Sequence, residues 1–188
     1  HETDAARVEI RRAPNIVSLR PQSPPPDLLR GEVLIKTGDG ISTDDILPAG
    51  PLTRHLRSNL PAISMYVFHN LDRTFVRRAS EKGGGFIVGG ENFGMGVPRE
   101  HAALGPWHLG IRAVLARSFD HAFRSLLVNN GIWPLLADTS ALDFGDVLEI
   151  DMRSGEAGRF TAHNFTQDRS FTVSADLSER DLEIVRHG

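Results

Sequence analysis

The sequence predicts an α/β domain with a mixed, partly parallel sheet, helices and a second β layer. Between residues 86 and 137, short apolar runs alternate with segments of helical periodicity, an order typical of parallel strands joined by crossover helices. After Leu142, short segments of alternating character are separated by polar turns. That pattern indicates antiparallel strands, which would form the second β layer.

Residues 1–30 differ from the rest of the chain. Four prolines, at positions 21, 24, 25 and 26, cannot donate backbone hydrogen bonds and favour extended conformations. We therefore expect a linker or N-terminal extension over residues 1–30 and one folded domain over residues 31–188. A linker in this place suggests that a further segment once lay upstream.

The first half of the folded part alternates apolar runs with glycine and proline breaks. The expected elements are a buried strand at 33–35, a helix at 61–68 and a helix at 72–82 that ends at the glycines 83–85. The segment around Pro48, Gly50 and Pro51 is expected to be irregular.

Strand 86–90 leads into a glycine-rich loop. The helix that starts near Arg99 is expected to end before Pro106, because the residue before a proline disfavours helical backbone. The remaining elements are strand 111–116, helix 119–130, strands 132–137, 147–150, 159–162 and 170–173, and a final helix that Ser178 caps together with Asp181.

The composition excludes several classes of protein. A chain of 188 residues that is 40% hydrophobic and 24% charged is an ordinary globular domain. A net charge of -3 with scattered basic residues gives no indication of nucleic-acid binding. The absence of an apolar run of membrane-spanning length and of a signal peptide predicts a cytoplasmic protein without a membrane partner. Without cysteine, this chain alone cannot form a disulfide or hold a thiolate-ligated metal.

Residues 91–104 are the most informative stretch, reading Glu-Asn-Phe-Gly-Met-Gly-Val-Pro-Arg-Glu-His-Ala-Ala-Leu. A strand, a glycine-rich turn and a helix start aim backbone N–H groups at a small anion. Gly94 and Gly96 form the turn. Arg99 is the strongest anion-binding candidate, because the helix dipole favours negative charge at its position. The segment does not match the dinucleotide-binding fingerprint, since Arg99 occupies the place of the third glycine.

Other polar residues near these segments leave two interpretations open. Of the adjacent carboxylates Asp44 and Asp45, one could handle a proton or hold an arginine, whereas aspartates in loops commonly cap turns. Arg57 could bind a carboxylate through two parallel hydrogen bonds, or be a solvent-facing arginine. His101 could be a general acid or base, but we favour a packed residue that, with Asn92 and Glu100, supports the loop. The eight histidines show no metal-binding spacing.

Three ordered segments together resemble the C-terminal swivel domain of the aconitase family. Residues 38–50 (Gly-Asp-Gly-Ile-Ser-Thr-Asp-Asp-Ile-Leu-Pro-Ala-Gly) resemble the first signature of that domain. Residues 56–64 are similar to the arginine segment that follows it in bacterial aconitases, and residues 90–104 with the adjoining strands are similar to the second signature. The resemblance covers roughly residues 31–150.

This resemblance implies a swivelling β/β/α domain and a reversible hydro-lyase activity, citrate to isocitrate through cis-aconitate in tricarboxylic acid metabolism. The related isopropylmalate dehydratases carry the domain as a separate small subunit. A [4Fe-4S] cluster would lie on partner domains or a large subunit, and the substrate would be a polycarboxylate. Asp44 matches the family's catalytic aspartate, and Arg57 and Arg99 match its two arginines that bind substrate carboxylates.

The chain departs from the family pattern at Val97 and Pro98, where the resemblance implies two serines that contact the substrate, the first as the proton-transferring base. Valine has no ionisable group, and proline also lacks a backbone N–H. A general base contributes about a hundred- to ten-thousandfold in rate. The leading prediction is an aconitate hydratase-like enzyme that is inactive as an isolated chain, with Gly94, Gly96, Val97 and Pro98 against the substrate. The alternative is a non-catalytic module that binds a carboxylate or a partner protein.

Overall fold

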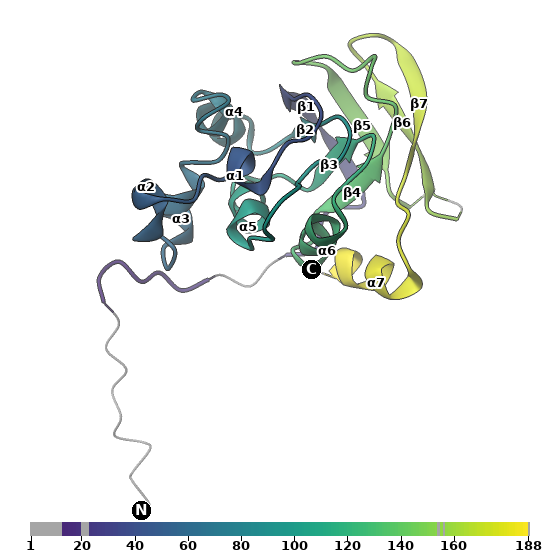
Figure 1. Ribbon diagram of the computed structural model, residues 1–188. Coiled ribbons are helices and arrows are strands. Elements are labelled where there is room, and N and C mark those ends of the chain that lie inside the picture. Colours follow the sequence, from purple (N-terminus) through teal and green to yellow (C-terminus); the bar gives the residue numbers. More distant parts are fainter. Residues whose placement is uncertain (1–12, 20–22, 154, 156, 188) are drawn as a thin grey trace, which may run out of the picture.

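Seven strands and seven helices make up the described part of the chain, which in this computed structural model comprises residues 13–19, 23–153, 155 and 157–187 (Figure 1). The strands are β1 (Leu28–Lys36), β2 (Phe86–Val88), β3 (Ala113–Ala116), β4 (Trp133–Leu136), β5 (Val147–Asp151), β6 (Arg159–Asn164) and β7 (Arg169–Ser174). The helices are α1 (Thr43–Ile46), α2 (Pro51–Arg54), α3 (Leu60–Ser64), α4 (Phe75–Lys82), α5 (His101–His108), α6 (His121–Asn129) and α7 (Glu179–His187). None of them is long and apolar enough to cross a membrane.

The strands form one closed barrel in the order β1-β2-β3-β4-β7-β6-β5. Neighbours among β1 to β4 run parallel, as the alternation of strands and helices predicted, whereas β5, β6 and β7 pair antiparallel. The antiparallel strands predicted as a second β layer are thus joined to the parallel ones in a single sheet. Strand β5 pairs with β1 over five residues, but β7 meets β4 through the single pair Leu136 and Ser174.

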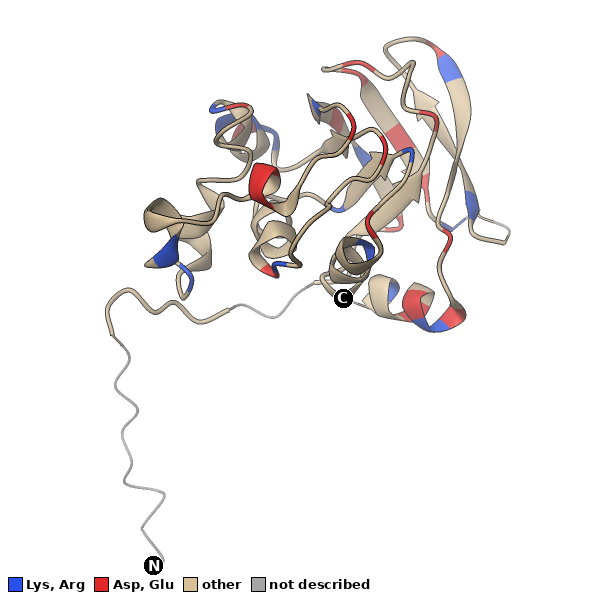
Figure 2. Ribbon diagram, viewed as in Figure 1, with Lys and Arg blue, Asp and Glu red and all other residues tan. Residues whose placement is uncertain are grey.

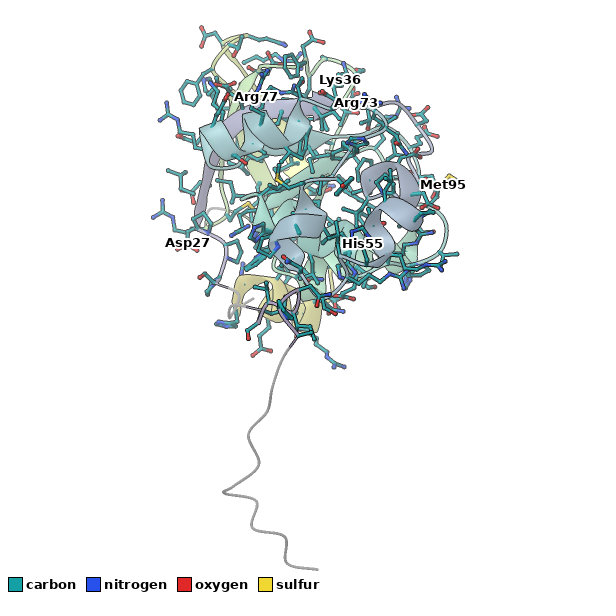
Figure 3. All side chains as sticks on the ribbon, turned by 90° about the vertical axis from the view of Figure 1, so that its left-hand side faces the viewer. Asp27, Lys36, His55, Arg73, Arg77 and Met95 are labelled. Atoms are coloured by element: carbon teal, nitrogen blue, oxygen red, sulfur yellow. The ribbon has the colours of Figure 1, made fainter. Side chains whose placement is uncertain are left out.

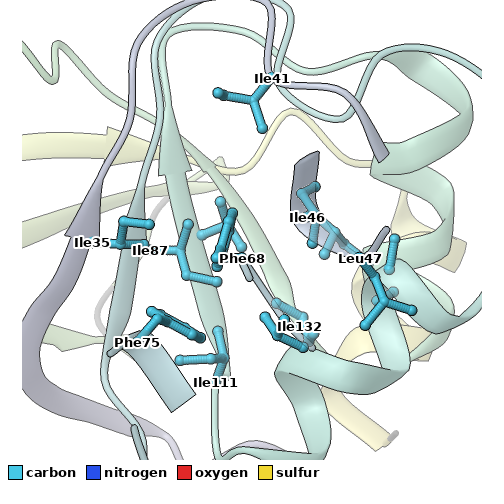
Figure 4. Packing of buried hydrophobic residues seen from close by; sticks show 14 of the residues in the cluster. Ile35, Ile41, Ile46, Leu47, Phe68, Phe75, Ile87, Ile111 and Ile132 are labelled. Carbon is cyan, nitrogen blue, oxygen red and sulfur yellow. The ribbon is translucent and has the colours of Figure 1, made fainter. Parts of the chain in front are cut away.

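The barrel separates two hydrophobic clusters. Phe86 and Val88 belong to the cluster inside the barrel, while Ile87 belongs to the one between the strands and the helices, as expected from the two-residue period of a strand. Figure 4 shows the outer cluster, to which Ile87 and Phe68 both belong. Helices α1 to α5 lie on the side of the parallel strands away from β5, β6 and β7 (Figure 1).

The predicted elements are present, mostly with shorter ends, but three differences have clear causes. Helix α5 continues through Pro106, so the prediction that it ends before this residue was wrong. Gly105 precedes the proline, and a Cβ there would lie 2.8 Å from Cγ2 of Val67. Burial of Gly105 and Pro106 in the α5 packing offsets the lost backbone hydrogen bond.

The second and third differences concern the start of the domain. Strand β1 begins at Leu28, inside the segment predicted as a linker, because its first residues pair with the end of β5. The short helices α1 and α2 were not predicted. Helix α1 has a capping box in which Ser42 and Asp45 bond each other's backbone N–H groups.

Asp72 links the start of α4 to β1. It accepts hydrogen bonds from Thr74 and from Arg78, which also donates to the Leu34 carbonyl. The Arg78 hydrogen bond lowers the pKa of Asp72 to about 2. The pKa of an aspartate in the unfolded chain is higher, about 3.9. The ionised Asp72 therefore stabilises the folded protein fully above about pH 3.9, and this stabilisation is lost as the pH falls through about 2.

Asp72→Asn is therefore expected to lower the free energy of unfolding by about 1–2 kcal/mol at pH 7, with the difference from wild type vanishing near pH 2. Denaturant titrations at several pH values measure this. Glu81→Gln is the control, since Glu81 pairs with Arg77 on the exposed face of the same helix, where such pairs contribute little. Equal effects of the two substitutions at pH 7 would contradict the prediction.

Candidate active site

Three loops meet where the parallel strands end. Ser42, in the loop after β1, forms an isolated β-bridge with Met95, in the loop after β2. Phe93, in the same loop after β2, forms a second one with Phe119, in the loop after β3. The carboxylate of Asp39 accepts hydrogen bonds from the Glu91 backbone N–H, at 2.8 Å, and from Arg117. The carboxyl ends of parallel strands are the usual position of ligand sites in α/β proteins.

The two glycines of the second loop have different roles. Gly94 is buried with a φ of +85°, and its N–H donates to the Ile41 carbonyl at 2.7 Å. A Cβ at Gly94 would lie 2.0 Å from Cδ1 of Phe123, so this glycine allows the loop to pack on α6. Gly96, with a φ of +100°, is exposed, and a Cβ there would have Thr43 Oγ1 as its nearest neighbour, at 3.9 Å. Of the two glycines, Gly96 is therefore the one that lies open to solvent.

Asp44 and Arg99 form a bidentate ion pair. Arg99 Nη2 lies 2.9 Å from Asp44 Oδ2, and Nη1 donates to Oδ1. The Arg99 hydrogen bond lowers the pKa of Asp44 below its ordinary value, so the carboxylate is ionised at neutral pH. Of the two functions considered for the aspartate pair, Asp44 thus holds an arginine, while Asp45 caps the turn at Ser42.

The triplet Arg99-Glu100-His101, which leads into α5, contacts three different segments. Arg99 binds Asp44 of α1, Glu100 accepts a hydrogen bond of 2.8 Å from the side chain of Asn130 at the end of α6, and His101 Nε2 lies 2.9 Å from the Arg57 carbonyl. Figure 2 shows the acidic α1 on the same side of the molecule as the basic turn between α2 and α3. The start of α5 therefore connects the parts that carry the candidate residues.

Arg57 has an exposed side chain that makes no polar contact within the described residues. His55, two residues before it, lies within the face turned to the viewer in Figure 3, with Met95 at the right-hand edge of that view. A guanidinium that has no carboxylate partner in the protein can donate its hydrogen bonds to the carboxylate of a ligand. Arg99 has N–H groups left beyond the two that Asp44 uses.

Val97 and Pro98 form the tip of the loop. The Val97 side chain is 69% exposed, while its carbonyl accepts a hydrogen bond of 2.8 Å from the buried Thr43. The backbone N–H groups of Gly96, Val97 and Arg99 have no acceptor among the described residues. The tip thus combines free backbone donors with an exposed apolar side chain, next to the Asp44–Arg99 pair.

Sequence reasoning missed several residues that build this edge. Asn92, which was predicted to support the loop, has a φ of +52° and donates its N–H to Oγ of Ser118 at 2.8 Å, and Ser118 is one of the missed residues. Asp39 and Thr43 connect loops in the same way. Their glycine- and aspartate-rich surroundings indicated turns, but only the folded chain shows which loop each side chain reaches.

The donor set for a metal cluster is absent from this chain. It has no cysteine, and its described residues contain no group of three or more His, Asp or Glu side chains that could hold a metal ion. The residues of this chain therefore do not fit a [4Fe-4S] cluster as ligands.

Fold and site define an α/β-barrel domain that presents arginine and carboxylate groups at its strand ends, a class suited to binding a carboxylated small molecule. The family model for the aconitase C-terminal domain matches residues 73–140. The chain is 44% identical over 120 residues to 3-isopropylmalate dehydratase small subunit 2 of Archaeoglobus fulgidus, covering 64% of this chain and 70% of the relative. It is 38% identical to the methanogen homoaconitase small subunit of Methanocaldococcus jannaschii, covering 64% and 68%.

A crystal structure of 3-isopropylmalate dehydratase from Methanocaldococcus jannaschii has the same fold, with a TM-score of 0.73, 28% sequence identity, and coverage of 84% of this chain and 87% of that one. The chain belongs to the aconitase family, as a C-terminal swivel domain related to the small subunits of the isopropylmalate dehydratases.

Proposed function

We propose that this chain is the carboxylate-binding component of an aconitase-type hydro-lyase and acts together with a partner that carries a [4Fe-4S] cluster. The observation that carries the proposal is the bidentate Asp44–Arg99 pair at the strand ends, which His101 links to the Arg57 turn. Two arginines on segments that the start of α5 connects suit a substrate with at least two carboxylates. When bound on the partner, the cluster would supply the Lewis acid for the substrate hydroxyl.

The proposed substrate is a hydroxy acid with two or three carboxylates, of the kind on which isopropylmalate dehydratases and homoaconitases act. The names of the relatives support these substrates and give no support to citrate as the specific substrate or to a place in tricarboxylic acid metabolism. The exposed Val97 next to Arg99 is compatible with an alkyl group on the substrate. The non-catalytic alternative is not favoured, because the relatives are named as components of enzymes.

Val97 and Pro98 give the proposal its sharpest test. Neither residue can take a proton, and Asp44, whose pKa is lowered by Arg99, is a weak base. We expect the chain reconstituted with a cluster-bearing partner to hydrate the unsaturated acid slowly. Val97→Ser/Pro98→Ser is expected to raise kcat about a hundredfold or more.

Hydration is measured as the loss of ultraviolet absorbance of the conjugated double bond. Pro98→Ser alone is the matched control, because it restores a backbone N–H without restoring the base. Equal kcat values for wild type and the double variant would show that the base lies elsewhere. Binding of 2-isopropylmalate without turnover in either form would support the non-catalytic alternative.

A further inference from the structure

The turn that carries Arg57 is held through its backbone. Residues 55–59 connect α2 to α3, and two successive carbonyls of this turn accept hydrogen bonds from distant segments. The Arg57 carbonyl lies 2.9 Å from His101 Nε2, and the Ser58 carbonyl lies 2.9 Å from the Val17 N–H. The Arg57 side chain has no polar partner within the described residues. These backbone contacts therefore hold the Cα from which the side chain extends.

The His101 contact also assigns a hydrogen. A carbonyl oxygen can only accept, so the hydrogen bond requires that Nε2 of His101 carries the proton. This ring nitrogen is thus a donor to the protein itself. It is not free to remove a proton from a substrate while the contact lasts.

His101 and Arg99 lie two residues apart at the start of α5. Hydrogen bonds to other parts of the chain hold both Arg99 and the residue between them, Glu100. Arg99 is bonded to Asp44, and Glu100 is bonded to Asn130, whose side chain is 3% exposed. Among the described residues, the hydrogen bond from His101 Nε2 to the Arg57 carbonyl is the polar contact that joins the turn of Arg57 to the segment of Arg99, alongside the packing of α3 on α5.

We propose that His101 is a positioning residue that sets the separation of the two carboxylate-binding arginines, Arg57 and Arg99. The inference rests on the proposed function of these arginines. It deepens that function, because a set separation selects dicarboxylates whose carboxylate groups have a matching spacing. Misplacing Arg57 weakens binding of such a ligand without changing the chemistry at Arg99.

The experiment is a double-mutant cycle on the full chain, with 2-isopropylmalate titrated as the probe and binding followed by NMR chemical shifts. His101→Leu and Arg57→Gln are each expected to raise Kd about tenfold, and the double variant no further than Arg57→Gln alone, because positioning has no effect once the guanidinium is gone. Additive losses would overturn the inference.

His101→Gln supplies an N–H donor at a similar reach and is expected to restore Kd to within about twofold of wild type. His121→Gln, an exposed histidine on α6, is the matched control and should leave Kd unchanged. Long-range proton–nitrogen spectra should show hydrogen on Nε2 of His101. A hydrogen on Nδ1 alone would refute the contact without using any ligand.

The outcomes separate the inference from the proposed function. If Arg57→Gln leaves Kd unchanged, the assignment of Arg57 as a carboxylate ligand fails, whatever His101 does. If Arg57→Gln weakens binding but His101→Leu does not, only the positioning role fails. A reconstituted complex gives a further readout: His101→Leu should raise KM about tenfold with kcat nearly unchanged, and the pH profile of kcat should not shift.

Discussion

Arg99→Ala is expected to weaken binding of 2-isopropylmalate about a hundredfold. The variant loses the guanidinium that can bind a carboxylate bidentately, a charge-assisted contact of about 1.5–3 kcal/mol. Arg99→Lys should recover only part of the affinity, because an ammonium group cannot make two parallel hydrogen bonds. Titration of the ligand into the isolated chain measures both, and Arg54→Ala, which removes an exposed arginine on α2, is the control.

The same substitution should change the titration of Asp44. Because the Arg99 hydrogen bond is the largest cause of the lowered pKa, the pKa of Asp44 is expected to rise in Arg99→Ala, and the Asp44 carboxyl carbon signal in NMR reports it. An unchanged titration together with unchanged ligand affinity would show that the Asp44–Arg99 pair does not form in solution. An unchanged affinity alone would remove Arg99 from the binding site.

Gly94→Ala is expected to cost about 3–5 kcal/mol of folding free energy. The added Cβ would lie 2.0–2.6 Å from three atoms of Phe123, a side chain that is 1% exposed and cannot move aside without opening the core. The φ of +85° adds backbone strain of about 1 kcal/mol. Thermal or denaturant unfolding measures the loss.

Two other glycines separate the clash from the strain. Gly96 has a φ of +100° but its nearest neighbour would be 3.9 Å away, and Gly145, with a φ of +84°, has no atom within 4 Å. Gly96→Ala and Gly145→Ala should therefore each cost only about 1 kcal/mol. A similar cost for all three variants would show that the packing of Gly94 on Phe123 contributes nothing.

Much of the fold could be predicted because its signals are local. The apolar runs and caps gave most of the strands and helices, including the final helix, where Ser178 and Asp181 bond as expected. Closure of the barrel could not be predicted, because it depends on one distant pair, Leu136 with Ser174. The path of α5 through Pro106 depends on Gly105 packing against Val67, which no local pattern reveals.

The candidate site shows the same division. The loop residues, the two arginines and the departure at Val97 could be identified from the sequence, and binding measurements test the roles predicted for them. The sequence left the roles of Asp44 and Asp45 open, because both residues are aspartates and both positions fit either role. Their separation arises from the fold, which turns Asp44 toward Arg99 and Asp45 toward Ser42.

The joint between β4 and β7 has a consequence for synthesis on the ribosome. Strands β1 to β4 emerge first, yet the partners of the two outer ones, β5 and β7, lie at residues 147–151 and 169–174. Before β5 has left the exit tunnel both edges of the nascent sheet are unpaired, and the edge of β4 stays unpaired until β7 has followed. Unpaired edges can pair with strands of other chains. The yield of this protein in cells is therefore expected to depend on chaperones that shield nascent chains.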